Sequence, residues 1–337
     1  MPIVASTDWT EQVPPEEDAR HRGYADELRA LARARKAKTG HEGRVLHYKP
    51  HVGVQAEVVV GELPEALRMG PFAAAKTWPA YLRFSNGSSQ RAPDSKPDVR
   101  GVALKLVGVP GTKLIPGLES ALTQDFLFIQ TPAISTGTPD DFMALVRAAK
   151  DGPLWLLPRL IGSLGLFEAL RVVQGVLGMP KITSMAAGRF YTAAPLRFGD
   201  RAVKLDLVPE SEAPAKHGRG PDALRDDLIA RLEAGPIRYR LRAQFFVDEA
   251  TTPIEDASVV WPTPFHELAQ VVIPQQAVAS ERGRAVEDYV ETISFDPWHA
   301  LVELRPIGAI MRARAHAYRE SVLERGAVAE PDGSESF

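Results

Sequence analysis

The stretch Ala80-Tyr-Leu-Arg-Phe-Ser-Asn86 is filled by apolar and aromatic residues and ends in polar ones, which is typical of a β-strand. The next such stretch, Asp98-Val-Arg-Gly-Val-Ala-Leu-Lys-Leu106, begins with a charged pair and a glycine. Working outward from these two, we predict strands over Val52–Val60, Ala80–Phe84, Gly101–Val107, Asp125–Gln130, Ala202–Leu207, Ile237–Val247 and Leu268–Ile273. Strands separated by short turns favour an antiparallel barrel or sheet over a doubly wound fold.

Helical patterns lie on both sides of this strand-rich middle, so the expected fold class is α+β. Phe198-Gly-Asp-Arg201 predicts a hairpin turn between two strands. We divide the chain into an N-terminal helical arm (1–40), a main domain (41–326) and a disordered tail (327–337). The predicted helices are Glu17–Lys38, Asp140–Lys150, Leu154–Val176, Asp222–Ala234 and Gly308–Arg325.

Composition excludes several classes of function. The chain has 337 residues, of which 45% are hydrophobic and 25% charged, and a net charge of −3, which gives no reason to expect a nucleic-acid partner. It contains no cysteine, so disulfides, iron–sulfur clusters and thiolate zinc sites are excluded. The first residues are polar and acidic and lack the basic and apolar regions of an export signal. We therefore expect a cytoplasmic protein.

The segment 153–178 is apolar enough to raise the question of membrane insertion. Pro158, Arg159, Glu168 and Arg171 interrupt it, and each charge at the centre of a bilayer costs about 2.5–3.5 kcal/mol. Buried helices or a lid are therefore expected, with a hydrophobic substrate entrance as the alternative, and no stable membrane insertion.

The helical stretch Met311-Arg-Ala-Arg-Ala-His-Ala-Tyr-Arg-Glu-Ser-Val-Leu-Glu-Arg325 carries a candidate site. Arg314 and Tyr318 are four residues apart and Tyr318 and Arg325 seven, so all three side chains lie near one face of the helix. This arrangement suits a phenolate beside a cation, with a further cation placed to meet an anion. Haem iron and its carboxylates form one ligand that needs both.

Five segments, in this order, resemble motifs of the haem catalases. Arg44-Val-Leu-His47 resembles the distal-histidine segment Arg-Val-Val-His, and Leu82-Arg-Phe-Ser85 resembles Val-Arg-Phe-Ser. Asp98-Val-Arg-Gly-Val-Ala-Leu-Lys105 resembles Asp-Pro-Arg-Gly-Phe-Ala-Val-Lys, and Val260-Trp-Pro262 resembles a later Val-Trp-Pro. Arg314-x-x-x-Tyr318 resembles the proximal Arg-x-x-x-Tyr. Each motif alone has a structural explanation, and it is their order and spacing that make the resemblance specific.

The resemblance implies an eight-stranded antiparallel β-barrel with surrounding helices, and haem b buried between the barrel and the proximal helix. In that arrangement Tyr318 ligates the iron, and Arg314 stabilises the phenolate because a guanidinium does not give up its proton. Arg44, Arg83 and Arg325 hold the propionates. The candidate haem contacts are Arg44, Arg83, Phe142, Arg314, Tyr318 and Arg325.

On the opposite side of the haem, the resemblance assigns the acid–base role to His47, with Ser85 orienting its ring. His47 takes a proton from the peroxide and returns it to the leaving oxygen, which gives a ferryl intermediate. An imidazole suits this role because its pKa lies near the operating pH. His51, four residues on, is expected to be incidental.

The chain also departs from the catalases. Where they have a distal asparagine, in Asn-Asn-Thr-Pro-Ile-Phe-Phe, this chain has Leu122-Thr-Gln-Asp-Phe-Leu-Phe128. Thr123 and Gln124 are the candidate substitutes, and we assign Thr123 to the catalytic set. The chain also lacks the C-terminal helical domain and the long arm of catalases. We therefore expect a peroxidase with an organic co-substrate and weak catalase activity at most, acting on hydrogen peroxide or on organic, including lipid, hydroperoxides.

Two alternatives remain open. One is a hydroperoxide-rearranging enzyme like the allene oxide synthases, in which a threonine precedes the distal histidine. Leu46 stands there instead, which favours the peroxidase. The other is a non-catalytic haem-binding protein, against which the His47–Ser85 pair argues. A homodimer is an assembly that the sequence leaves open.

Overall fold

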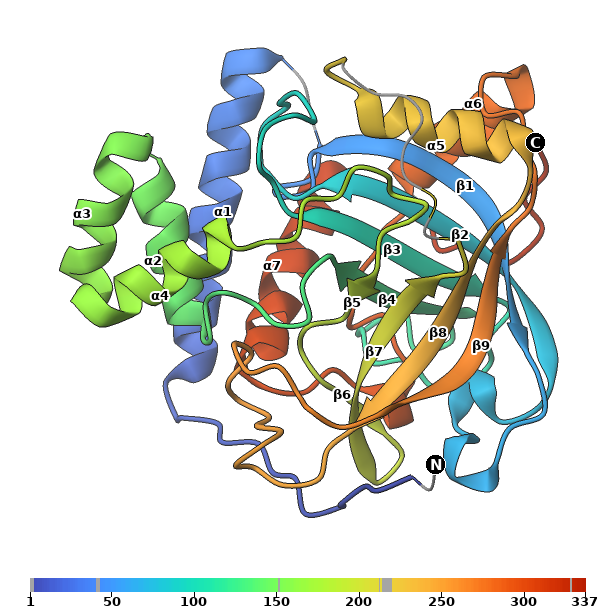
Figure 1. Cartoon of the computed structure of the whole chain (residues 1–337), viewed down its shortest axis with the longest axis horizontal. Helices are drawn as coiled ribbons and strands as arrows, with labels where there is room; N and C mark the ends of the chain where they lie inside the picture. The colour runs from blue at the N-terminus through green and yellow to red at the C-terminus, as the bar shows by residue number, and fades with distance from the viewer. Residues whose placement is uncertain (1–2, 41–42, 151, 212, 214–219, 328) are drawn as a thin grey trace.

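The fold is built around an antiparallel β-barrel with helices on one side and one end (Figure 1). A computed structural model describes residues 3–40, 43–150, 152–211, 213, 220–327 and 329–337. The strands are β1 (Lys49–Val60), β2 (Lys76–Asn86), β3 (Arg100–Val107), β4 (Thr123–Ile129), β5 (Phe190–Tyr191), β6 (Leu196–Phe198), β7 (Arg201–Pro209), β8 (Ile237–Phe245) and β9 (Phe265–Ile273).

Eight of these strands form a closed ring, which confirms the expected barrel. The sheet runs β5-β4-β3-β2-β1-β9-β8-β7-β6, and an additional pairing of β5 with β7 closes it. β6 lies outside the ring and pairs only with β7 among the described strands, in the hairpin predicted at Phe198–Arg201. Gly199 in that turn has a φ of 68°, a conformation that glycine adopts without steric cost.

The barrel is filled by alternate side chains of its strands. Val52, Val54 and Val58 of β1 are completely buried, as are Leu82 and Phe84 of β2. Alternate residues of a strand point to opposite faces, so the remaining side chains point outward. The outward set on β2 includes Arg83 and Ser85, both also buried, and something must therefore cover the barrel there.

Helices provide that cover. They are α1 (Glu17–Thr39), α2 (Pro139–Ala149), α3 (Pro153–Leu164), α4 (Leu166–Leu177), α5 (Ala223–Ala234), α6 (Glu281–Thr292) and α7 (Ala309–Arg325), with short 3-10 turns at Glu65–Leu67, Gly70–Phe72 and Val302–Leu304. α6 packs on β1, where Gly53 permits the close approach, since a Cβ at that position would lie 2.7 Å from the Val290 side chain. α1 and α7 lie side by side next to the barrel (Figure 1).

Two expectations about helices need correction. The single helix predicted over 154–176 is two helices, α3 and α4, because Gly165 between them has a φ of 80°. α6 was not predicted, because its sequence, ERGRAVEDYVET, is mostly polar and only Val286 and Val290 are buried.

The tail after Gly326 also differs from the disordered segment expected. Glu330 is only 8% exposed and pairs with Lys105 at 2.5 Å, and Phe337 packs against Tyr289. A buried lysine needs a carboxylate partner. The contact of Glu330 with Lys105, which lies far away in the sequence, therefore holds the described part of the tail against the barrel.

Candidate functional site

His47, two residues before β1, has an unusual backbone conformation and lies beside the end of β2 and the start of β3. Its φ is 54°, in the left-handed region that residues other than glycine seldom adopt and that often marks functional sites. Its N–H donates to the Gly87 carbonyl at 2.9 Å, and its Nδ1 lies 3.0 Å from Ser85 Oγ. The ring rests on Gly101, where a Cβ would come within 2.5 Å of it. The glycine of the Asp98–Lys105 segment therefore makes room for the imidazole.

The electrostatic surroundings keep the His47 imidazole neutral. Burial, and then the positive charges of Arg83, Arg314 and Arg44, lower the pKa of His47 to about 3. This differs from the expectation of a pKa near the operating pH. At neutral pH the ring is consequently a proton acceptor, with one nitrogen next to Ser85.

Arg44 and Arg83 share a carboxylate that the sequence analysis missed. Glu291, near the end of α6, accepts from Arg83 Nε at 2.6 Å and from Arg44 Nη1 at 3.0 Å. Arg83 also donates to the His47 carbonyl at 3.0 Å. Burial would raise the pKa of Glu291, but Arg83 and Arg44 outweigh it and lower the pKa. Arg325 reaches the same place from α7 and donates to the Glu291 carbonyl at 2.8 Å.

The face of α7 predicted as the proximal site has the expected local geometry. Arg314 Nη2 donates to the Tyr318 hydroxyl at 2.9 Å, and both side chains are half-buried. Among the described elements, α7 packs along α1 and touches α2, and no barrel strand packs extensively on it. Arg325, at the end of α7, donates to the Glu291 carbonyl, and the Glu291 side chain accepts from Arg83, which itself donates to the His47 carbonyl. The end of α7 and the His47 site are therefore linked by a short chain of hydrogen bonds.

This donor set fits a haem better than a bare metal ion. Tyr318 offers an oxygen ligand beside a guanidinium, and Arg44, Arg83 and Arg325 offer cations for carboxylates. No group of three or more histidine, aspartate or glutamate side chains in the described residues is arranged to hold a metal ion.

Thr123, which we assigned to the catalytic set, has other partners. Its hydroxyl lies 3.1 Å from His299 Nε2 and 2.9 Å from a Glu330 oxygen. It begins β4, whereas Gly101 beneath His47 pairs with Ile129 at the other end of that strand. Gln124, the other candidate, accepts from the Leu301 N–H at 2.9 Å. The structure brings neither into contact with His47.

Phe142 and His51 occupy different settings. Phe142 is half-buried in the first turn of α2, and its contact with haem stays a prediction. His51 is completely buried, with Nε2 2.7 Å from Asn86 Oδ1. It thus belongs to the buried polar core at this end of the barrel.

A buried charged cluster of Lys105, Asp125, Glu330 and His299 was also missed. Lys105 Nζ lies 2.6 Å from Asp125 and 2.5 Å from Glu330, and its side chain is completely buried. Burial raises the pKa of Asp125 to about 6, against the effect of Lys105 and His299. Lys105 belongs to the Asp98–Lys105 motif, but the sequence pattern of the tail did not predict that Glu330 would pair with it.

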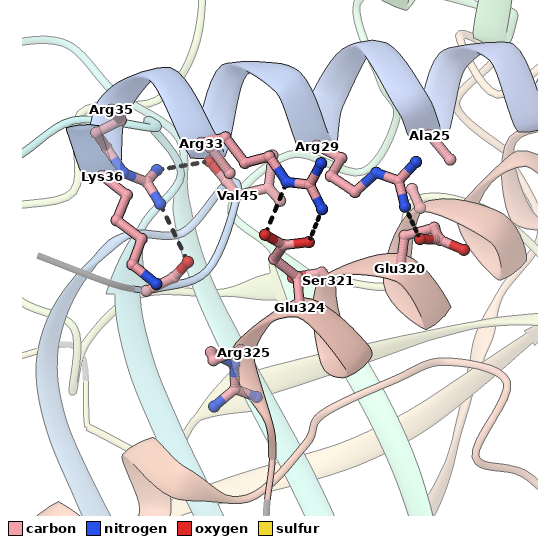
Figure 2. Close-up of a pocket in the computed structure, with 13 residues that line it drawn as sticks. Ala25, Arg29, Arg33, Arg35, Lys36, Val45, Glu320, Ser321, Glu324 and Arg325 are labelled. Atoms are coloured by element: carbon pink, nitrogen blue, oxygen red, sulfur yellow. Dashed lines mark hydrogen bonds and ion pairs between the residues drawn. The ribbon is translucent and has the colours of Figure 1, made fainter. Parts of the chain in front are cut away.

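Figure 2 shows a pocket between α1 and α7, next to Arg325. Its walls are joined by ion pairs across the two helices, Arg33 with Glu324 and Arg29 with Glu320, both at 2.7 Å. These pairs fix α7 against α1 and thereby fix the position of Tyr318. Arg35 lines the same pocket and donates to backbone carbonyls, among them that of Val45.

Comparison with known proteins agrees with the fold and the motifs. No family model matches the chain. A catalase-related peroxidase from Mycolicibacterium paratuberculosis is 29% identical over 286 residues, which cover 79% of this chain and 85% of that protein.

Solved catalase structures have the same fold. A fungal catalase superposes with a TM-score of 0.64 at 16% identity, over 97% of this chain and 66% of its own. Catalase A from Saccharomyces cerevisiae has a TM-score of 0.64 at 15% identity, over 98% of this chain and 68% of its own. A bacterial catalase has a TM-score of 0.61 at 17% identity, over 88% of this chain and 59% of its own. This chain thus spans about three fifths to two thirds of the length of these catalases.

The fold is that of the catalases, an antiparallel barrel with a helical layer beside a histidine and a tyrosine site. In sequence the chain is similar to a catalase-related peroxidase, and in fold it is similar to the catalases.

Proposed function

We propose that the protein is a haem-dependent peroxidase that reduces hydrogen peroxide or organic hydroperoxides with an organic co-substrate. The observation that carries the proposal is the pairing of two sites that are linked through Arg83, Glu291 and Arg325. One is the neutral His47 beside Ser85, and the other is Tyr318 beside Arg314. The name of the M. paratuberculosis relative, catalase-related peroxidase, supports the same class of oxidoreductase.

The proposed cofactor is haem b, which when bound supplies the redox chemistry. Tyr318 would hold the iron, and the Arg314 guanidinium, 2.9 Å from the phenol oxygen, would favour its anionic form. Arg44, Arg83 and Arg325 would hold the two propionates. Glu291 already accepts from two of these arginines, so a propionate would share them with this carboxylate.

His47 moves the proton in the proposed reaction. The neutral ring would take the proton from one oxygen of the hydroperoxide and deliver it to the other, which leaves as water or an alcohol. The two electrons for cleavage of the O–O bond would come from the haem. Ser85, 3.0 Å from Nδ1, fixes the ring so that Nε2 faces the substrate. Gly101 leaves space for that orientation.

We further propose that disproportionation of hydrogen peroxide is weak. A second peroxide needs a hydrogen-bond donor beside the histidine to hold it for oxidation. Thr123 bonds to His299 and Glu330 instead. Oxidation of an organic co-substrate does not need that donor, because the co-substrate only has to transfer electrons to the haem.

The test compares three reactions of the haem-loaded wild-type protein: oxygen release from hydrogen peroxide, peroxide-driven oxidation of a phenolic dye, and conversion of a fatty-acid hydroperoxide. We expect dye oxidation to exceed oxygen release, and the fatty-acid hydroperoxide to yield its alcohol. His47→Ala should lose at least a hundredfold in dye oxidation, since acid–base catalysis contributes about 10²–10⁴-fold.

His266→Ala, which changes a half-buried histidine of β9, is the matched control and should retain activity. Full dye oxidation by His47→Ala would remove His47 from the mechanism. An allene oxide as the main product would favour the rearranging enzyme over the peroxidase.

A further inference from the structure

Helices α3 and α4 carry a dense group of exposed apolar side chains. Leu154 is 88% exposed, Phe167 85%, Leu177 79% and Trp155 59%. Leu157, Leu166 and Leu170 of the same two helices are also exposed. The exposed large apolar residues elsewhere in the described chain are scattered over several elements. A group of large exposed apolar side chains on two adjacent helices is typical of a binding surface.

These helices are apolar on their inner face as well. Leu160, Ala169 and Val172 are completely buried and, with Ala148 of α2, form a small core of their own. A helix that is apolar on all sides is normally buried. In this structure α3 and α4 project away from the barrel beside α2 (Figure 1), so their outer face lacks the cover that its composition requires.

The charge around the patch indicates what covers it. Residues 150–181 contain four basic side chains (Lys150, Arg159, Arg171 and Lys181) and two acidic ones, whereas the whole chain has a net charge of −3. A local excess of positive charge next to exposed tryptophan, phenylalanine and leucine is the composition of a surface that binds anionic lipid headgroups.

We propose that the α3–α4 patch docks on the surface of an anionic lipid bilayer. No described helix is long and apolar enough to cross a membrane, and α3 and α4 have 12 residues each. They therefore lie in the interface, with Trp155 and Phe167 at the depth of the headgroups. A second copy of the chain fits the patch less well, because self-association would bring two positively charged surfaces together.

This inference does not depend on the proposed peroxidase activity, because it concerns binding alone. It adds a location to that activity, since hydroperoxides of membrane lipids form in the bilayer on which the patch would rest. The two claims have separate readouts and fail separately.

Vesicle flotation of the full-length protein tests the proposal. Wild-type protein should float with vesicles of phosphatidylcholine containing one part in three of phosphatidylglycerol, and at least tenfold less with pure phosphatidylcholine or in high salt. Trp155→Ser/Phe167→Ser should lose at least tenfold in binding to the anionic vesicles. The control Val13→Ser/Val260→Ser changes residues that are 61% and 56% exposed elsewhere and should bind like wild type.

A charge-reversal variant, Arg159→Glu/Lys181→Glu, keeps the proposal testable if the apolar variant misfolds, and it should lose binding to the anionic vesicles. Wild-type protein that stays with the unbound fraction, or equal binding by all variants, would overturn the proposal. Mass photometry supplies the competing outcome. A wild-type dimer that dissociates in Trp155→Ser/Phe167→Ser, without vesicle binding, would assign the patch to a second copy.

Discussion

His47 shows how the surroundings of a single residue determine its conformation and its protonation state. Its left-handed backbone directs the ring onto Gly101, and three arginines together with burial hold the ring neutral. The free energy spent in desolvating the imidazole is part of the cost of folding. It should therefore be measurable in the stability of the haem-free protein.

The first prediction concerns the pH dependence of that stability. The pKa of His47 is about 3 in the fold and about 6.5 in the unfolded chain, so the unfolded state binds more protons as the pH falls from 6.5 toward 3. The neutral ring contributes fully to the free energy of unfolding above pH 6.5. Below pH 6.5 this contribution is lost progressively, by up to about 1.4 kcal/mol per pH unit.

Urea unfolding at pH 7 and pH 5 measures this effect, with His47→Gln as the comparison, because glutamine does not titrate. Between the two pH values, the wild type should lose about 1–2 kcal/mol more unfolding free energy than the variant, allowing for the partial exposure of the ring. Equal losses in both proteins would contradict the depressed pKa. His51 and the carboxylates are the same in both and cancel.

Sequence reasoning at this scale succeeded where the partners lie on one element. The four-residue spacing of Arg314 and Tyr318 predicts their contact on any α-helix. It did not find Glu291 or the true partners of Thr123, because those contacts join distant segments. The residue that covers an outward-facing strand position comes from a helix or a tail that packs there in the folded chain. The local sequence pattern does not indicate which distant segment will pack at that position.

At the scale of elements, the tail after Gly326 is the segment whose behaviour differs most from expectation. Its acidic, glycine-containing sequence is typical of a frayed end, yet Glu330 completes the buried charged cluster with Lys105 and Asp125. The second prediction is that Glu330→Gln lowers the unfolding free energy by about 2–3 kcal/mol, because it leaves a buried ammonium with a single carboxylate.

Glu335→Gln, five residues on in the same tail, is the control. Its carboxylate lies 3.5 Å from the Tyr81 hydroxyl and is half-buried, so its loss should cost less than about 1 kcal/mol. Chemical denaturation of both variants gives the comparison. Equal stability of the two would show that the Glu330 contact does not hold the tail.

Helices and strands were predictable to different extents for physical reasons. The seven strands predicted correspond to β1–β4 and β7–β9, because their apolar side chains fill the barrel. β5 and β6 were missed because two or three residues carry no periodic pattern. α6 was missed because few of its residues are buried, although it is the element that positions Glu291.

At the scale of the whole molecule, the barrel contains the main core and the candidate site lies on its outer side. Eight strands close into a ring, so its core needs nothing from α7. α7, which carries Tyr318, packs along α1 with ion pairs such as Arg33–Glu324 between them and does not pack extensively on the barrel strands. The resemblance to catalases predicted this architecture, whereas composition and periodicity alone predicted only an antiparallel barrel or sheet with helices.

The central claim is that Tyr318 binds the iron of haem b, and optical titration of haem into the haem-free protein tests it most directly. Tyr191→Phe is the matched control, since Arg189 lies over that ring at 4.8 Å much as Arg314 lies over Tyr318 at 5.0 Å. Wild type and Tyr191→Phe should give the same one-to-one titration and spectrum, whereas Tyr318→Phe should lose the haem band or shift it grossly. An unchanged spectrum and affinity in Tyr318→Phe would show that Tyr318 does not bind the iron.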